Sequence, residues 1–237
     1  MKKIIGIIPK VEPFQPEKST SEDWYFLGNN YTKRIQELGC LPICLSPVDG
    51  KIDPAVLDLC DGFLAQGGRK VMPYHFQAIH HAVNSGKRYL GICLGMQLVH
   101  IYFTIRKYVE QHDTGDDLLT QILDVYFNRR SQFSLLERVE GHRFSYVPRG
   151  QEHLTKHNVE VAPGTTLHDL TGKTTLSAAS FHSWRVVNPV DDLMVSAWAS
   201  GDESTIEGIE YRDYILGVQF HPEVDDQLPE IFRFFTK

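Results

Sequence analysis

The stretch Gly91-Ile92-Cys93-Leu94-Gly95 follows an apolar run that begins at Arg88, and it constrains the fold more than any other part of the sequence. A cysteine between two glycines at the end of an apolar strand is typical of a nucleophile elbow, a sharp turn from strand to helix. Gly91 and Gly95 lack the side chains that would keep the two backbone segments apart. The dipole of the following helix favours a thiolate at Cys93. The pattern predicts a nucleophilic cysteine, although alone it also fits a buried structural one.

Strand-helix alternation around this turn predicts an α/β fold. Apolar runs typical of strands alternate with helical patterns, the strands over 3–8, 41–45, 62–65 and 88–93 and the helices over 30–38, 53–59 and 74–84. This alternation implies a mostly parallel central sheet with helices on both faces. A small antiparallel section and a C-terminal helix are expected after it, with strands over 158–161, 174–176, 185–187, 193–199, 205–210 and 215–221 and the helix over 228–235.

The segment from about 100 to 150 interrupts this pattern. Helices are expected over 101–109 and 118–127, on either side of a turn at 111–116. Aromatic and charged residues occur together throughout, unlike in a linker. We interpret the segment as an inserted helical lid or subunit contact within a single domain that spans residues 1–237.

Composition and charge exclude several classes of protein. The 237 residues carry a net charge of −6 with scattered Lys and Arg, so no nucleic-acid partner is expected. No segment is long and apolar enough to span a membrane, and the first apolar run ends at Pro9, too early for a signal peptide. A cytoplasmic protein with reduced thiols is expected. Cys40 and Cys44 are more typical of core residues than of a metal or redox pair.

A second motif, His221-Pro222-Glu223, ends the last apolar run. In an extended backbone, residues two apart point to the same side, and Pro222 favours an extended conformation at His221. Glu223 can then accept a hydrogen bond from one imidazole nitrogen while the other faces a thiol. This arrangement of nucleophile, base and orienting carboxylate is that of acyl transfer. The alternative is a solvated turn.

Acyl transfer also requires donors for the oxyanion of its tetrahedral intermediate. The backbone N–H of Leu94, directly after the candidate nucleophile, is one expected donor. Gly67 and Gly68 follow the preceding strand, and Gly68 is the expected second donor. A plain turn at these glycines is the alternative.

With these motifs the sequence resembles the class I glutamine amidotransferase family. Within the family it is most similar to the branch of γ-glutamyl hydrolases that includes γ-glutamyl-γ-aminobutyrate hydrolase. The resemblance covers about residues 1–98 and 155–237. It is carried by segments of specific sequence, at 66–74, 91–97, 180–182, 206–210 and 218–223. The resemblance implies a flavodoxin-like fold.

The resemblance also implies a chemistry. Cys93 would form a γ-glutamyl thioester, which water then hydrolyses, and no metal or other cofactor would take part. The substrate, a small γ-glutamyl compound, would be held by a further set of residues, namely Gly67, Gln97, Ser180, Phe181 and His182.

The chain departs from the family pattern where the leaving group should be recognised. Arg69-Lys70 stands where small or acidic residues are usual, and Ser183-Trp184 stands where His-Gln is more common. The two basic residues either pair with a carboxylate of the leaving group or are solvated, and the second reading is preferred. The remaining histidines, His80, His81, His153 and His157, are interpreted as surface or packing residues rather than metal ligands.

Three functions remain open on the sequence. The first is a stand-alone hydrolase of γ-glutamyl amides. The second is a glutaminase subunit that delivers ammonia to a separate synthase, with the segment 100–150 as the docking surface for the synthase or for a second copy in a homodimer. The third is a catalytically silent binding or scaffold protein.

Overall fold

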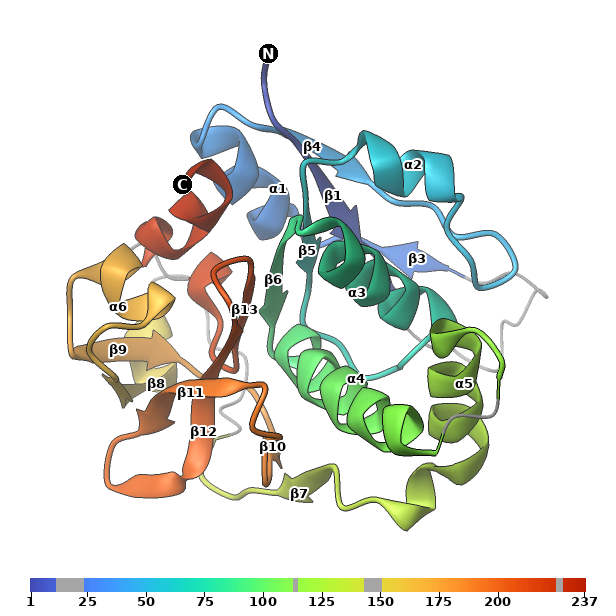
Figure 1. Cartoon of the computed structure of the whole chain (residues 1–237). Helices are drawn as coiled ribbons and strands as arrows, with labels where there is room; N and C mark the ends of the chain where they lie inside the picture. The colour runs from blue at the N-terminus through green and yellow to red at the C-terminus, as the bar shows by residue number, and fades with distance from the viewer. Residues whose placement is uncertain (12–23, 113–114, 143–150, 225–227) are drawn as a thin grey trace, which may run out of the picture.

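The computed structural model describes residues 1–11, 24–112, 115–142, 151–224 and 228–237, except the side chains of 152 and 153. Within these residues a nine-stranded sheet forms the centre of the molecule (Figure 1). Its strands, in spatial order, are β4 (Leu41–Cys44), β1 (Ile4–Ile8), β5 (Gly62–Ala65), β6 (Arg88–Ile92), β13 (Ile215–Val218), β12 (Asp202–Tyr211), β11 (Met194–Ala199), β8 (Lys156–Val161) and β9 (Thr175–Ala179). The first five run parallel, and each later pair is antiparallel.

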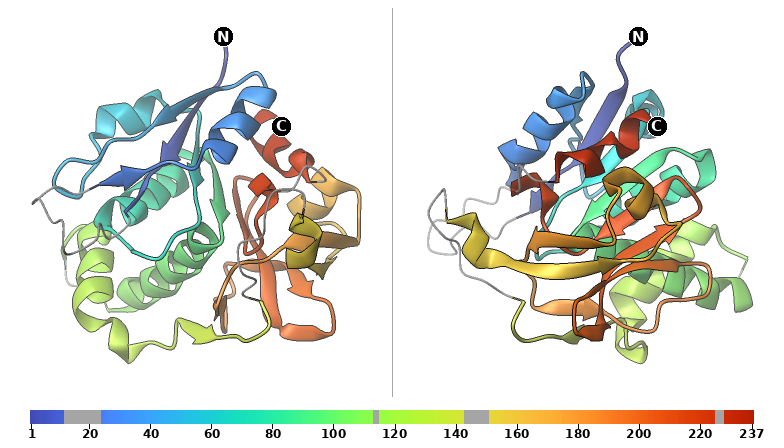
Figure 2. Two further views of the ribbon diagram at one scale, coloured as in Figure 1. Left: turned by 180° about the vertical axis from the view of Figure 1, so that it is seen from behind. Right: turned by 90° about the vertical axis from the view of Figure 1, so that its left-hand side faces the viewer.

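Helices cover both faces of this sheet, as Figure 2 shows from two further sides. One face packs against α2 (Pro54–Leu59), α3 (Pro73–Ser85) and α4 (Leu94–Gln111), and α5 (Leu118–Asp124) packs in turn on α3 and α4. The other packs against α1 (Asn29–Glu37), α6 (Thr166–Thr171) and a C-terminal 3₁₀ helix, Pro229–Thr236. The predicted α/β fold, with a mostly parallel sheet and a smaller antiparallel section, is confirmed.

Local chemistry explains several element boundaries. The side chain of Asp53 accepts a hydrogen bond from the N–H of Ala55 at 2.9 Å, and Pro54 fills the first position of α2, where no N–H is needed. Helix α3 ends at Gly86, whose φ of 67° suits glycine. The strands β1, β5, β6 and β13 are buried almost throughout, as expected for a parallel sheet covered on both faces.

Apart from shifts of a few residues at element ends, three elements differ from the expectation, one in its sheet, one in its extent and one in its helix type. The strand expected over 185–187 is β10 (Trp184–Val186), which pairs with β7 (Leu136–Arg138) in a separate two-stranded sheet. The strand expected over 215–221 ends at Val218: the N–H of Gln219 still bonds to Glu207 O on the neighbouring strand β12, but that of His221 bonds to Ala179 O at the end of β9. The C-terminal helix is a 3₁₀ helix. Another two-stranded sheet joins β2 (Lys10–Val11) to β3 (Tyr25–Phe26).

The segment from 100 to 150 begins inside a helix. Helix α4 runs unbroken from Leu94 to Gln111, so the helix expected over 101–109 is its second half. Helix α5 continues as a π-helix, Val125–Arg129, and a 3₁₀ helix, Arg130–Gln132. Buried side chains such as Ile122 and Tyr126 join the same apolar cluster as the sheet. Part of the expected turn at 111–116 and residues 143–150 lie outside the described residues.

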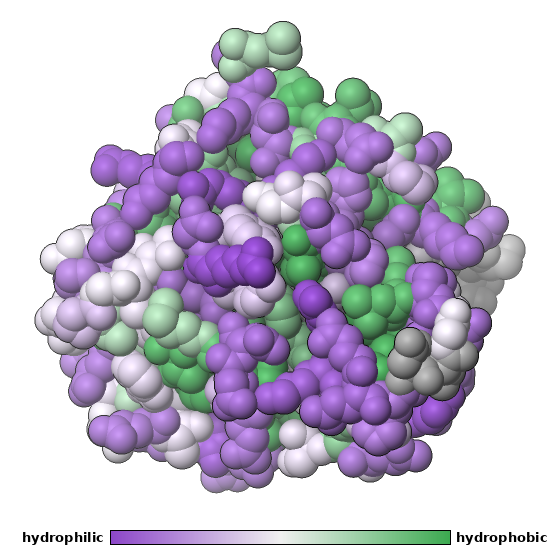
Figure 3. Space-filling view, in the orientation of Figure 1, coloured by the Kyte–Doolittle hydropathy of each residue, from purple (hydrophilic) through white to green (hydrophobic). Residues whose placement is uncertain are grey.

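Polar residues cover most of the face in Figure 3, with separate apolar patches between them, as on ordinary protein surfaces. Among the described residues, none of the helices has the length and apolar character needed to cross a membrane.

Replacing Gly95 by alanine should destabilise the fold by about 2–3 kcal/mol, because overpacking of a close contact carries a cost of that size. The new Cβ would lie 2.6 Å from the Ala65 carbonyl oxygen. Gly86→Ala is the matched control, since its Cβ would meet nothing within 4 Å and only its positive φ is unfavourable. That control should lose about 1 kcal/mol. Chemical denaturation of both variants tests this, and equal losses would contradict the close approach at the elbow.

Candidate functional site

Cys93 lies between β6 and α4 on the expected strand-to-helix turn. Its φ of 53° and ψ of −105° fall in a region that side chains other than glycine rarely adopt, which is typical of strained functional positions. Two hydrogen bonds fix the turn, from Cys93 N–H to Val218 O at 2.8 Å and from Gln97 N–H to Cys93 O at 3.1 Å. A Cβ on Gly91 would lie 2.5 Å from the Gly95 carbonyl group, so both glycines are sterically required. The residue is 9% exposed and lines a pocket, so a substrate can reach it.

His221 and Glu223 lie beside this turn. His221 Nδ1 is 2.7 Å from Glu223 Oε1, and Glu223 is buried. The expectation that an extended backbone pairs them is wrong, because Pro222–Val224 form a 3₁₀ turn. This turn, closed by the N–H of Val224 on His221 O at 3.4 Å, brings the two side chains together. The two side chains thus pair as the motif predicts, but through a different backbone conformation.

The charges around His221 change its proton affinity. Burial alone would lower the pKa of His221, but the charges of Glu223 and Cys93 and hydrogen bonds with both raise that pKa well above its usual value of 6.5. The imidazole therefore binds a proton more tightly than an ordinary histidine. This is the electrostatic condition for accepting the proton of a neighbouring thiol.

Tyr31, on α1, is part of the site although no sequence motif indicates it. Its hydroxyl donates to Glu223 Oε1 at 2.7 Å and accepts from the N–H of Gly67 at 3.2 Å. Burial and the neighbouring Glu223 raise the pKa of Tyr31 well above 10.0, so the hydroxyl stays a donor. Tyr31 thus joins the carboxylate to the loop after β5. A tyrosine in a helix 192 positions from its partner carries no local signal that could have revealed it.

The two glycines of the loop after β5 have different surroundings. A Cβ on Gly67 would lie 2.8 Å from His221 Cε1 and 3.4 Å from Cys93 Cβ, so this position must remain glycine for the three residues to meet. Its N–H is used by Tyr31. Gly68 lies beside Leu94, since its Cβ would be 3.3 Å from Leu94 Cδ2. Gly68 and Leu94, the two candidate oxyanion donors, line a pocket that Cys93 also lines.

Gln97, one turn into α4, lines the same pocket and is held firmly. Its side-chain amide donates to Trp184 O at 3.1 Å and to Gln219 Oε1 at 3.0 Å. Both hydrogens of the amide group are thereby used, which leaves the carbonyl oxygen of Gln97 for a ligand.

The segment Ser180-Phe181-His182 is divided between pocket and interior. Phe181 lines the pocket and packs edge-on against His221, with ring centroids 5.2 Å apart. Ser180 is fully buried, and its hydroxyl donates to His142 O at 2.8 Å. His182 reaches the pocket wall, but its ring is 1% exposed and faces Glu207.

The pocket has a volume of about 760 Å³ and a basic rim. Arg69, Arg130 and Arg138 line it, and its described lining contains neither aspartate nor glutamate. Arg130 also lies over the Tyr126 ring, 5.3 Å from its centroid. Arg130 and Arg138 come from the segment 100–150, so that segment supplies part of the pocket wall. Positive charge without compensating acids suits an anionic ligand.

The other histidines singled out in the sequence lie away from Cys93. His80 contacts the Tyr102 hydroxyl at 3.0 Å, and His81 packs edge-on against Phe63. The side chain of His153 lies outside the described residues. His157 is partly buried on β8, with its Nε2 3.5 Å from Glu207 Oε1.

The fold and the turn at Cys93 define an α/β protein with a nucleophile elbow at the carboxyl ends of its parallel strands. The chain belongs to the class-I glutamine amidotransferase family, whose model matches residues 29–235. The domain is accordingly that of a hydrolase of amide C–N bonds.

Two curated relatives show how widely this domain is used. The glutamine amidotransferase-like protein RP404 of Rickettsia prowazekii is 25% identical over 94% of this chain and 91% of its own length. A CTP synthase of Chlorobium luteolum is 26% identical over 66% of this chain, but the match spans only 26% of that enzyme.

Solved structures agree on the fold. The glutaminase domain of Trypanosoma brucei CTP synthase, solved with bound acivicin, has a TM-score of 0.66 at 20% identity and covers 99% of this chain and 93% of its own. A GMP synthase subunit protein of Thermoplasma acidophilum has a TM-score of 0.58 at 18% identity, with 99% and 92% coverage.

Glu223→Gln should lower the pKa of His221 toward 6.5, because the charge that most raises it is removed. Tyr31→Phe keeps that charge and is the matched control, in which the pKa of His221 should stay high. NMR titration of the His221 ring measures both. An unchanged pKa in Glu223→Gln would refute the electrostatic role of the carboxylate.

The same shift links stability to pH. The pKa of His221 is higher in the folded state than in the unfolded state. The His221–Glu223 pair therefore makes its full contribution to stability at pH values below 6.5, the ordinary pKa of histidine. This contribution is lost as the pH rises through the raised folded-state value, so Glu223→Gln should destabilise the protein more at low pH than at high pH.

Proposed function

We propose that this chain hydrolyses γ-glutamyl amide bonds through a γ-glutamyl thioester on Cys93. The observation that carries the proposal is the placing of Cys93, which lines the pocket, next to Gly67 and His221, with Glu223 bonded to the far nitrogen of His221. The first two residues are the nucleophile and its base, and Glu223 orients the base. The same arrangement speaks against a catalytically silent scaffold protein.

The reaction proceeds in two stages, formation of the thioester and its hydrolysis. His221 takes the proton of the Cys93 thiol, and the sulfur attacks the amide carbon to give a tetrahedral oxyanion. The N–H groups of Leu94 and Gly68 bind that oxyanion. The C–N bond then breaks, and the amine leaves with the proton held by His221. His221 then takes a proton from water, and the resulting hydroxide attacks the thioester carbon. The C–S bond breaks, glutamate is released, and His221 returns the proton to the Cys93 thiolate.

The basic rim favours a substrate with more than one carboxylate. One arginine suffices for the α-carboxylate of a γ-glutamyl group, whereas Arg69, Arg130 and Arg138 present three positive charges. Gln97 and the segment 180–182 complete the recognition of the γ-glutamyl part. We therefore propose a leaving group that carries a carboxylate, as in γ-glutamyl amino acids. A reactive thiol requires reducing conditions, so the cytoplasm is the proposed location.

A glutaminase subunit is the second candidate. The relatives favour it, since CTP synthase carries such a domain as one part of a larger enzyme. In this case glutamine is the substrate, and a separate synthase docks on the segment 100–150 and takes up the ammonia. A second copy of the chain is the other partner proposed for this segment.

Cys93→Ala should reduce release of glutamate from γ-glutamyl compounds by at least about 1000-fold, as loss of a catalytic nucleophile does in related mechanisms. The assay compares γ-glutamyl amino acids, γ-glutamyl amines and glutamine, with Cys44→Ala as the control for an unrelated thiol. If wild type and Cys93→Ala are equally inert on the whole panel, the hydrolase proposal fails. Glutamine turnover that rises strongly only with an added synthase would favour the second candidate.

Arg69→Gln and Arg138→Gln should each raise KM about 10-fold for γ-glutamyl amino acids, the usual range for a charged hydrogen bond, with little change in kcat. The loss should be smaller for γ-glutamyl amines, whose leaving groups lack a carboxylate. Lys173→Gln, 52% exposed beside Glu230, is the matched control. Equal losses on both substrates would assign the arginines to the α-carboxylate alone and contradict the proposed leaving group.

A further inference from the structure

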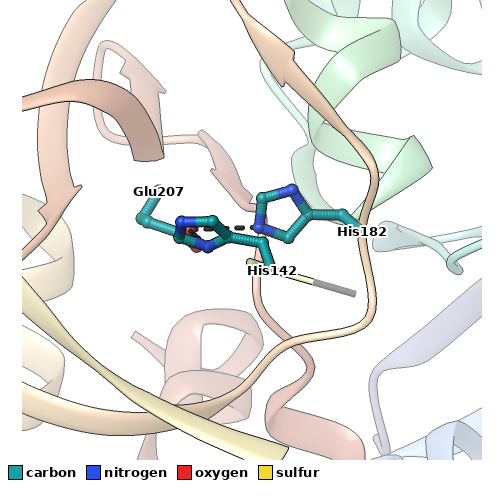
Figure 4. Close-up of side chains that lie close together, drawn as sticks. All are labelled: His142, His182 and Glu207. Atoms are coloured by element: carbon teal, nitrogen blue, oxygen red, sulfur yellow. Dashed lines mark hydrogen bonds and ion pairs between the residues drawn. The ribbon is translucent and has the colours of Figure 1, made fainter. Parts of the chain in front are cut away.

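Three histidines surround one buried carboxylate behind the pocket wall. Glu207 lies on β12 and is fully buried. His182 Nε2 is 3.2 Å from its Oε1, and His142 Nδ1 and His157 Nε2 are each 3.5 Å from the same oxygen. Figure 4 shows the rings of His142 and His182 converging on Glu207. The segments after β7 and β9 thus meet β12 at a single carboxylate.

Several polar atoms of this cluster have no hydrogen-bond partner among the described residues. They are His142 Nδ1, His157 Nε2 and Glu207 Oε2, all without solvent contact. A buried carboxylate with an unpartnered oxygen is unfavourable unless a cation compensates it.

The hydrogen bonds of His182 indicate which of its ring nitrogens carries a proton and which one presents a lone pair to Glu207. Its Nδ1 lies 3.1 Å from Trp184 O, which can only accept, so Nδ1 carries a proton. In the neutral ring Nε2 then presents a lone pair to Glu207 Oε1 at 3.2 Å. Two lone pairs at this distance require a positive charge between them, either a second proton or a metal ion. A histidine that binds a metal typically donates its other N–H to a backbone carbonyl, as His182 does.

The distances from the histidine nitrogens to Glu207 Oε1 are close to those between two ligands of one metal ion. With tetrahedral coordination and metal–nitrogen bonds of 2.0–2.1 Å, ligand atoms lie about 3.3–3.4 Å apart. The three distances to Glu207 Oε1 are 3.2, 3.5 and 3.5 Å. The ligand atoms of His142, His182 and Glu207 all lie within 4.8 Å of one another. Two imidazoles and a carboxylate suit Zn²⁺ and similar transition metals, whereas Mg²⁺ and Ca²⁺ prefer oxygen ligands alone.

We propose that His142, His182 and Glu207 form a binding site for a divalent transition metal of the Zn²⁺ type, beside which His157 also contacts Glu207. The metal would join the segment after β7 and the pocket-lining segment 180–184 to the sheet. Glu207 also binds the chain that leads to His221, because its carbonyl oxygen accepts the N–H of Gln219 at 2.9 Å. The site therefore stabilises one wall of the pocket and takes no chemical part in the reaction.

The test measures metal binding by the full-length chain in a Cys93→Ala background, so that zinc cannot bind at the Cys93–His221 pair. After removal of metal with a chelator, ZnCl₂ is titrated against a chromophoric competitor, and CoCl₂ reports the ligands through its visible absorption. We expect one Zn²⁺ per chain, a tetrahedral Co²⁺ spectrum and a higher Tm with zinc. This readout is independent of the hydrolase proposal.

His142→Ala, at the edge of the cluster, and Glu207→Gln should each weaken zinc binding by more than about 100-fold, beyond the effect typical of outer partners. His112→Ala, an exposed histidine at the end of α4, is the matched control and should bind as the parent does. Circular dichroism of the metal-free variants checks that they fold, and His142→Ala decides the question should Glu207→Gln fail to fold. No stoichiometric binding by the parent, or equal binding by His142→Ala and His112→Ala, would overturn the proposal and leave a protonated His182–Glu207 ion pair.

Discussion

The close approach of Gly91 and Gly95 is the constraint on which the site depends. The chain must turn from β6 into α4 within one residue, and Cys93 adopts a left-handed backbone conformation to make this turn. The cost, on the order of 1–3 kcal/mol for a strained backbone, is met by burial of β6 and α4 on both sides. Because Gly95 also packs against Ala65, the turn fixes the loop after β5 relative to the thiol. Elbow, loop and thiol therefore form one rigid unit.

Sheet topology brings the other reactive groups to this unit. The parallel neighbours β5, β6 and β13 end at one edge, which places Gly67, Cys93 and His221 within contact of one another. Tyr31 then connects Glu223 to Gly67 through a single hydroxyl. The orientation of His221 thus depends on α1 and the loop after β5 as well as on its own turn. Three segments far apart in sequence are joined by hydrogen bonds to Glu223 and Tyr31.

The fold was predictable because strand and helix periodicities are local properties. The α/β class and most elements before Cys93 follow from runs such as 62–65 and from stops such as Gly86. Local reasoning failed where long-range hydrogen bonds decide, as at His221, whose N–H bonds to Ala179 O on another strand although the apolar run predicts that β13 continues to this residue. The site divides in the same way between local and long-range features. His221 and Glu223 lie two positions apart in one motif, whereas Tyr31 and the cluster around Glu207 are brought to their places by tertiary structure alone.

The central claim is that Cys93 carries the acyl group. Acid quenching during turnover of a γ-glutamyl substrate, followed by mass spectrometry of the intact chain and its peptides, tests it directly. The account predicts a mass increase of one γ-glutamyl group, confined to the peptide that contains Cys93 and removed by hydroxylamine, which cleaves thioesters. Turnover that continues after Cys93 has been alkylated, with no adduct on its peptide, would contradict it.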